Sequence, residues 1–174
     1  MSCALTSDYS QASCGDLFGG VPKIYLIEHA NIQSVTVTSD VVTSIVKTVP
    51  FKFRLYELKQ GTAEGKETKT VNKDNNTSSV KQTVTFSQQG LSAALRTEIE
   101  LLTKNLLGVV VLDENGTGWL YGKDKGMRAT SVDAGTGKAL SDFNGYNINL
   151  EAEEKYLAYP IDANTLASLT VIDD

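Results

Sequence analysis

The sequence predicts a mainly β, α+β protein, with a β-sandwich or β-barrel of about eight to ten short strands and one flanking α-helix. Three observations support this fold class. Short alternating or apolar segments, separated by turn residues, recur along most of the chain. Serine and threonine are plentiful, which favours strands and turns over helices. A long helical hydrophobic pattern occurs in only one stretch, and that stretch runs directly into a predicted β-hairpin.

The predicted helix covers about residues 89–106. Its apolar residues recur at spacings of three and four, which places them on one face. These residues are Leu91, Leu95, Ile99, Leu102 and Leu106. Ser87 or Ser92 would cap the N-terminus, and Gly108 would follow the C-terminal end. We expect one face of the helix to be buried and the other to meet solvent or a partner.

A β-hairpin follows the helix. Val109–Leu112 form an apolar run of strand length, Asn115-Gly116 is a strong turn signal, and Trp119–Tyr121 return as the second strand. Further strands are predicted at residues 23–28, 34–38, 51–58, 80–86, 127–132, 146–152, 156–161 and 169–172, and residues 41–46 either continue the strand at 34–38 or pair with it. Pro160 places the segment around it at a sheet edge, because proline cannot donate a ladder hydrogen bond.

The 174 residues fit a single domain that buries roughly 70% of its unfolded surface. Residues 1–20 are predicted to form an N-terminal arm, and residues 21–174 to form the domain. The segment at about residues 59–79 is polar and rich in turn residues, so it predicts an extended polar loop, within which residues 67–71 could form a short strand. A loop of this length is usually functional or disordered.

Composition excludes several function classes. A net charge of −5 at pH 7 argues against a surface that grips nucleic acid, although nucleic acid could slide past such a surface. No apolar run approaches the ~20 residues of a membrane helix, and the N-terminal residues lack the pattern of a signal peptide. Cys3 and Cys14 are expected to be free thiols, with a disulfide between them as the alternative. No metal or cofactor is expected, since a single histidine and two cysteines offer few zinc ligands.

Three partial motifs are better explained by local structure than by ligand binding or catalysis. Gly135–Lys138 resembles the end of a phosphate-binding loop, but the earlier glycine, the final Ser or Thr and the following helix are missing. Asp113–Asp124 approaches the spacing of a calcium loop, but strands rather than helices flank it. His29 has no identifiable nucleophile beside it. No catalytic residues are therefore assigned, and we expect the protein not to be an enzyme.

Residues 88–172 resemble phage tail tube proteins and related virion proteins. The shared pattern is a helix, a hairpin of the form V-x-D-x-x-G-x-x-W-L-x-G, a Gly-Thr-Gly loop, and D-x-N-G-Y leading into an alternating acidic strand. The matching residues are Asp113, Gly116, Trp119, Leu120, Gly122, Gly135, Thr136, Gly137, Asp142, Asn144, Gly145 and Tyr146.

This resemblance implies a virion structural protein, made in the host cytoplasm, that self-assembles into hexameric rings. The rings would stack into a hollow tail tube for DNA passage during ejection. Its partners would be further copies of itself, other tail or neck proteins, and passing DNA that is not bound specifically. The residues expected to serve self-assembly are Gly61, Glu64, Lys66, Asn75, Asn76, Trp119 and Tyr146.

Two other roles remain open at this stage. A head-tail connector, a tail terminator or an injection-machine tube protein would use the same ring-forming architecture. A ligand- or carbohydrate-binding β-sandwich used for decoration or adhesion would instead place Trp119, Tyr121 and Tyr146 on one binding platform.

Overall fold

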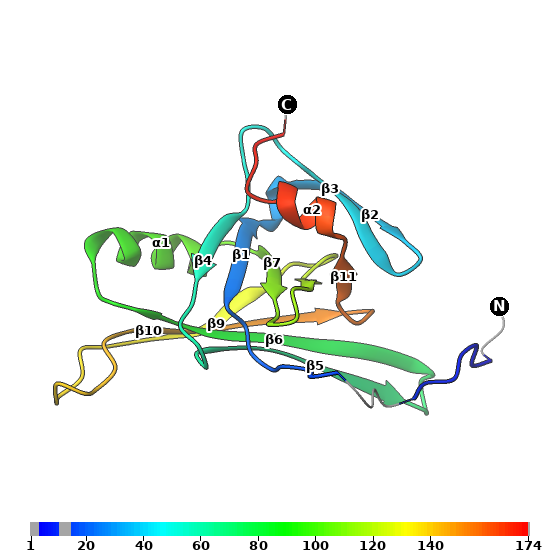
Figure 1. Ribbon diagram of the computed structural model, residues 1–174, viewed down its shortest axis with the longest axis horizontal. Helices are drawn as coiled ribbons and strands as arrows, with labels where there is room; N and C mark the ends of the chain where they lie inside the picture. Colours follow the sequence, from blue (N-terminus) through cyan, green and yellow to red (C-terminus); the bar gives the residue numbers. More distant parts are fainter. Residues whose placement is uncertain (1–3, 11–14, 174) are drawn as a thin grey trace.

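The computed structural model describes residues 4–10 and 15–173, which form two β-sheets and two α-helices (Figure 1). The larger sheet has the strand order β2-β3-β11-β8-β7-β1-β4, and the four-stranded sheet has the order β5-β6-β10-β9. The strands are β1 (Lys23–Glu28), β2 (Ile32–Thr38), β3 (Val41–Lys47), β4 (Arg54–Glu57), β5 (Ala63–Asn72), β6 (Thr77–Gln89), β7 (Leu107–Leu112), β8 (Gly118–Tyr121), β9 (Arg128–Gly135), β10 (Gly145–Glu154) and β11 (Tyr159–Ile161). The helices are α1 (Ala93–Lys104) and α2 (Ala163–Ser168), and a 3-10 turn, η1, spans His29–Asn31. The predicted mainly β fold class is confirmed.

Strands β1 and β7 are neighbouring interior strands of the larger sheet, and side chains from both enter cores on its two faces. In β7, Val109 and Val111 point into the core shared with the four-stranded sheet, while Val110 points into a second core on the opposite face. Ile24 and Ile27 of β1 divide between the same two cores. A strand covered on both sides needs apolar residues at every position, which explains why this segment is a continuous valine run rather than an alternating pattern.

The first core lies between the two sheets. Val84 and Phe86 of β6 and Leu150 of β10 supply its lower layer and are almost completely buried. Ile99 and Leu102 of α1 close one end of it. Burying each such side chain contributes roughly 1.5–3 kcal/mol, so the apolar stripe of α1 fixes the helix on this core. Figure 1 shows α1 lying beside the sheets.

Helix α1 is shorter than the predicted span of residues 89–106. Ser92 is the N-cap, and its hydroxyl accepts a hydrogen bond from the Leu95 N–H at 3.1 Å. At the other end the chain becomes extended at Asn105. Leu91 and Leu106 therefore lie outside the helix and are partly exposed. The hydrophobic spacing continued past both ends, but the cap and the extended residue limit the helix itself.

The expected polar loop at residues 59–79 is instead mostly a β-hairpin. β5 pairs with β6 over ten consecutive positions, from Ala63–Phe86 to Asn72–Thr77. Only the turns at its two ends remain irregular. One face of this hairpin meets solvent, and its distal half meets solvent on both faces. The strands therefore need little alternation of apolar and polar residues, and the polar sequence was interpreted as a loop.

Two predictions near the C-terminus are wrong. Residues 169–172 are not a strand, because Asp162 caps a short helix, α2, by accepting the Thr165 N–H at 2.8 Å, and the chain then turns. Pro160 does not lie at an edge, since β11 sits between β3 and β8. This strand is only three residues long, so a missing ladder donor disturbs little of the sheet.

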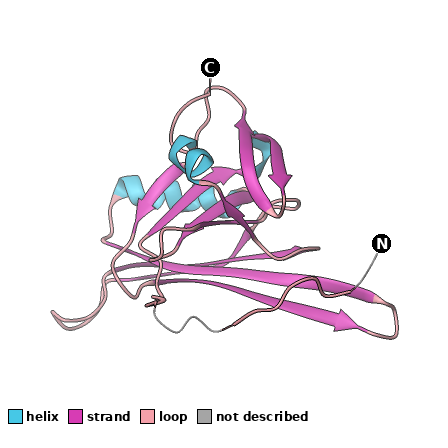
Figure 2. Cartoon of the chain, turned by 45° about the vertical axis from the view of Figure 1, so that its right-hand side comes forward, coloured by secondary structure: helices cyan, strands magenta, loops and turns pink. Residues whose placement is uncertain are grey.

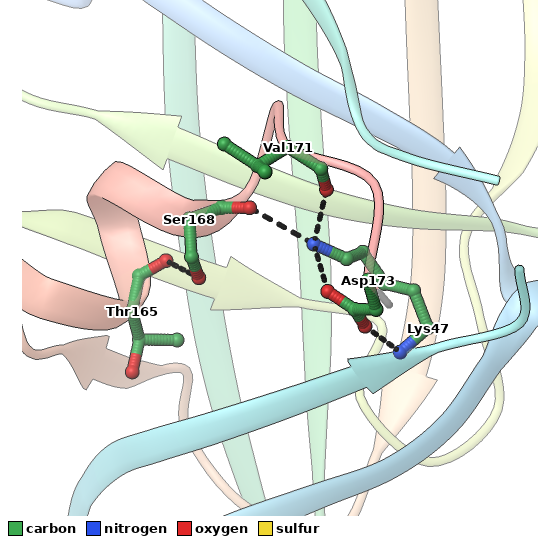
Figure 3. A network of polar contacts seen from close by, with 5 residues as sticks. All are labelled: Lys47, Thr165, Ser168, Val171 and Asp173. Carbon is green, nitrogen blue, oxygen red and sulfur yellow. Dashed lines mark hydrogen bonds and ion pairs between the residues drawn. The ribbon is translucent and has the colours of Figure 1, made fainter. Parts of the chain in front are cut away.

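Lys47 of β3 binds the C-terminal segment (Figure 3). The lysine is buried, with only 2% of its surface exposed. Its ammonium donates to the carbonyls of Ser168 and Val171, each at 2.9 Å, and pairs with the Asp173 carboxylate at 3.0 Å. The Lys47 backbone N–H also donates to Asp173. Partial burial raises the pKa of Asp173, but the hydrogen bonds and charge of Lys47 outweigh it and leave that pKa below its ordinary value. Every ammonium hydrogen therefore has an acceptor, as a buried charge requires.

Replacing Lys47 with methionine tests this contact. Lys47→Met keeps the apolar stem but removes the donor from three acceptors, so we expect the free energy of unfolding to fall by about 1.5–3 kcal/mol or more. Urea denaturation measures the change. Lys23→Met is the matched control, because Lys23 forms an exposed pair with Glu57 at 3.9 Å, and its loss should stay within about 0.5 kcal/mol. Equal losses in the two variants would contradict the assignment.

Candidate assembly surfaces

The four-stranded sheet has one apolar face and one polar face. Along β6 and β10, alternate residues enter the core, and the residues between them point away from the protein. The outward residues at the centre of the sheet are Thr83, Thr85, Asn147, Asn149 and Glu151. No large apolar side chain is found among the described residues of this outer face. The face is therefore suited to water, and a partner joining this sheet would gain more by pairing at its edges than by covering its face.

Both edges of the four-stranded sheet, β5 and β9, are unpaired in the described chain. All three pairings within this sheet are antiparallel, so its first and last strands run in opposite directions. If β9 of one copy lay beside β5 of the next, the antiparallel alternation would continue through the junction. The two edges differ in regularity. β5 pairs with β6 without a register shift, whereas β9 carries a shift beside Asn149 and Leu150 of β10.

The β5–β6 hairpin extends past the rest of its sheet. β10 pairs with β6 only as far as Val80, which is opposite Glu154. Beyond that point residues 69–79 form a two-stranded arm whose members are mostly exposed, and Figure 2 shows this arm reaching out from the body. An isolated two-stranded ribbon is marginally stable in water. The arm is thus an element that a partner could support.

The opposite end of the same sheet carries the loop of residues 136–144, between β9 and β10. Leu140 is fully exposed and Phe143 is 41% exposed. Asp142 organises the loop by accepting the backbone N–H groups of Lys138 and Ala139, each at 2.8 Å, and these bonds lower the pKa of Asp142. The sheet therefore has a projecting polar hairpin at one end and an ordered loop with exposed apolar side chains at the other.

The structure divides the seven residues expected to serve self-assembly. Glu64 and Lys66 lie on the outer face of β5, and Gly61 lies in the turn before that strand. Asn75 and Asn76 lie in the exposed turn of the hairpin arm, where Asn76 has a left-handed φ of 52°. These five share the β5 edge and its arm. Two others lie elsewhere: Trp119 is half-buried on β8, and Tyr146 is buried in the core on β10.

The placement of the aromatic residues also bears on the binding-platform alternative. Trp119 and Tyr121 share one face of β8 and line a common cleft. Tyr146 does not line that cleft. The structure therefore brings Trp119 and Tyr121 together, and places Tyr146 in the core instead.

A buried polar network joins the two sheets, and sequence reasoning missed it. The Glu67 carboxylate of β5 accepts from the Gln82 side-chain amide at 2.9 Å and from the Ala158 N–H at 2.6 Å. The Gln82 carbonyl oxygen accepts from the Gly122 N–H at 2.9 Å. These bonds satisfy backbone groups just after β8 and just before β11. The only sequence signal was a polar residue, Gln82, at an inward position of a strand.

The partial motifs have structural explanations. Asp113 accepts the backbone N–H groups of Asn115 and Thr117 and the indole N–H of Trp119. Both of its carboxylate oxygens therefore stabilise the hairpin turn. His29 lies in η1, and one ring nitrogen contacts the Lys123 carbonyl oxygen at 3.0 Å. Gly135–Lys138 closes β9 and enters a turn rather than a helix.

Gly65 is required by close packing between the sheets. A Cβ atom at this position would lie 2.8 Å from the Tyr121 hydroxyl oxygen and 3.1 Å from its ring carbon Cζ. Gly65→Ala should therefore lower the free energy of unfolding by about 1–3 kcal/mol, because Tyr121 is buried and must shift. Chemical denaturation measures the loss.

Two variants check that steric contact causes the effect. In the Gly65→Ala background, Tyr121→Phe removes the closest atom and should recover part of the stability. Gly135→Ala is the control, since nothing lies within 4 Å of its Cβ position, and it should change stability little. An additive double variant would argue against the contact.

Among the described residues, no helix is long and apolar enough to cross a membrane, and no three His, Cys, Asp or Glu side chains gather to hold a metal ion. Cys3 and Cys14 lie outside the described residues. Comparisons with protein-family models, with curated proteins and with solved structures find no match for this chain.

Proposed function

We propose that this protein is a structural subunit that self-assembles into rings, and that the rings stack into a hollow tube of the phage tail type. The observation that carries this proposal is the four-stranded sheet, whose two free edges run in opposite directions. Contacts between two different edges are heterologous, and heterologous contacts generate rings when the rotation between copies closes. The proposed role needs no catalysis and no cofactor.

The chemistry of the sheet supports a hollow centre. If such sheets close into a barrel, the apolar face of each sheet packs against the body of its own subunit and the polar face lines the lumen. The outer face carries Thr83, Thr85, Asn147 and Asn149 at its middle, which tolerate water. The cations of this face, Lys66, Lys81 and Arg128, are accompanied by the acidic residues Glu64, Asp133 and Glu151. The chain as a whole carries a net charge of −5. DNA would be repelled on average rather than retained in such a channel.

The edge strand β5 supports pairing more strongly than β9. Natural proteins protect free edges with bulges, prolines or short strands. β5 is ten residues long and contains neither a proline nor a register shift. Glu64, Lys66, Glu67 and Lys69 are the charged residues of β5 that would oppose unspecific pairing, and Asp133 on the outer face of β9 is a complementary partner for Lys66 of the next copy. This difference between the edges favours a β9-to-β5 junction.

The two ends of the sheet support stacking. The hairpin arm of residues 69–79 projects from one end, and the loop of residues 136–144 projects from the other. In a stack of rings with one orientation, the arm of each ring faces the loop end of the next. Exposed Leu140 would become buried at that contact.

Negative-stain electron microscopy and analytical ultracentrifugation test the proposed function. We expect rings with a central hole, most simply hexamers, and stacked tubes at high protein concentration. Rings that never stack would instead support the connector role. A protein that stays monomeric over the whole accessible concentration range would contradict ring formation.

Shortening the arm separates ring formation from stacking. Replacing residues 71–78 with Asn-Gly would join Thr70 to Ser79, which already face each other across the hairpin. This pair is two positions from the Asn72–Thr77 pair, so the hydrogen-bonding phase is retained. The shortened protein should keep its fold by circular dichroism and still form rings, but it should no longer form tubes.

Leu140→Ser is a point variant at the opposite end of the sheet and should also shorten tubes. Val171→Ser is its control, because the Val171 side chain is exposed and belongs to the C-terminal segment held by Lys47, not to either end of the four-stranded sheet. If the shortened arm and Leu140→Ser both leave tube length unchanged, the stacking contact lies elsewhere.

A further inference from the structure

A cleft of about 350 Å³ opens between the end of the N-terminal arm, β5 and β8. Residues 18–20 at the end of the arm and Val21 form one wall, and Gly65 and Glu67 form part of another. The arm is held there because the Asn115 side chain pairs with both the N–H and the carbonyl of Phe18, at 3.2 and 3.0 Å. The cleft is therefore built from well-fixed elements of three parts of the chain.

The Tyr121 hydroxyl has no hydrogen-bond partner among the described residues, although its side chain lines this cleft. Tyr121 is 7% exposed, and its hydroxyl oxygen lies at the β5 wall, next to Gly65. Burial and the charge of Glu67 raise the pKa of Tyr121 to about 12, so the group stays a neutral phenol at ordinary pH. The phenol oxygen is therefore available to form a hydrogen bond with a group that enters the cleft.

The charges around the cleft are negative and are not balanced. Glu67 and Asp113 line it, and neither pairs with a described lysine or arginine within 4.0 Å. Glu67 uses one carboxylate oxygen for Gln82 and Ala158, and its other oxygen makes no hydrogen bond within the described chain. Asp113 accepts only neutral N–H groups.

Trp119 adds an aromatic surface to the same cleft. Its indole N–H donates to Asp113 at 3.1 Å, which fixes the orientation of the ring. Indole faces attract ammonium and guanidinium groups, and the attraction increases when the cation is removed from water.

We propose that this cleft binds a cationic group, the ammonium or guanidinium of a lysine- or arginine-like ligand. The cation is placed between the Glu67 carboxylate and the Trp119 ring, and the Tyr121 oxygen accepts one of its N–H groups. A neutral polyol would gain nothing from the unbalanced carboxylates, which distinguishes this ligand from a sugar. The inference does not depend on the proposed assembly.

Binding can be followed through Trp119, because it is the only tryptophan in the chain. Intrinsic fluorescence is titrated with N-acetyl-arginine amide and N-acetyl-lysine amide, in which the side chain carries the sole charge. N-acetyl-citrulline amide, the neutral counterpart of the arginine probe, and a methyl glucoside are the comparison ligands. We expect a saturable change with the cationic probes that weakens as salt increases. An equal response to citrulline amide, or no saturation with either cationic probe, overturns the proposal.

Variants assign the roles of the lining residues. Glu67→Gln keeps an oxygen for Gln82 and Ala158 but removes the charge, and Tyr121→Phe removes only the hydroxyl. Each should weaken binding of the arginine probe at least about tenfold. Glu151→Gln, on the outer face of the four-stranded sheet, should leave the affinity unchanged. Fold is checked by denaturation of each variant, and unchanged affinity in a folded Glu67→Gln protein would overturn the site.

The cation could come from a side chain of a second copy or from a free molecule, and measurements of self-association distinguish these two sources. If a side chain of a second copy occupies the cleft, the arginine probe and Glu67→Gln should both weaken association measured by ultracentrifugation. If a free cationic molecule is the ligand, both should leave association unchanged while the probe still binds. Failure of the protein to form rings would leave the fluorescence result standing, so this site and the proposed function fail separately.

Discussion

The structure depends on one constraint, the burial of β1 and β7 on both faces. Val109, Val110 and Val111 supply apolar groups to two cores at once, and Ile24 and Ile27 do the same from the neighbouring strand. Because the apolar side chains of these strands point to both faces of the sheet, other elements must cover each face. The four-stranded sheet and α1 cover one side, while α2 and the segment held by Lys47 help to cover the other. The outer face of the four-stranded sheet is then left free for water.

This arrangement concentrates candidate interaction features on the four-stranded sheet and its surroundings. The sheet has free edges, a projecting hairpin and a polar face, whereas its inner face is tied to the rest of the protein by Glu67 and Gln82. The same glutamate faces the cleft beside Trp119 and Tyr121. The Glu67 carboxylate thus supports the contact between the sheets and also supplies charge to the cleft. Few other polar side chains are buried in the described part of this domain.

Prediction from sequence succeeded where a local pattern is compatible with only one type of secondary structure. The β7–β8 hairpin was predictable because Asn115-Gly116 favours a tight turn between two apolar runs. The centre of α1 was predictable from the spacing of Leu95, Ile99 and Leu102. Prediction failed where the environment of a segment was decided elsewhere. β5 was predicted as a loop with at most a short strand at residues 67–71, because its outer face and its arm meet solvent. The full length of the strand becomes apparent only when β6 pairs with it.

The sequence by itself determined the mainly β class, the central helix and the hairpin, because these follow from residue spacing and turn chemistry within a few residues. The tertiary structure alone decided which polar residues would come together. Lys47 meets Asp173 across 126 positions, and Glu67 meets Ala158 across 91. It also decided that Trp119 shares a cleft with Glu67 while Tyr146 enters the core. Pairings over such distances depend on how the sheets stack, and no local periodicity encodes that stacking.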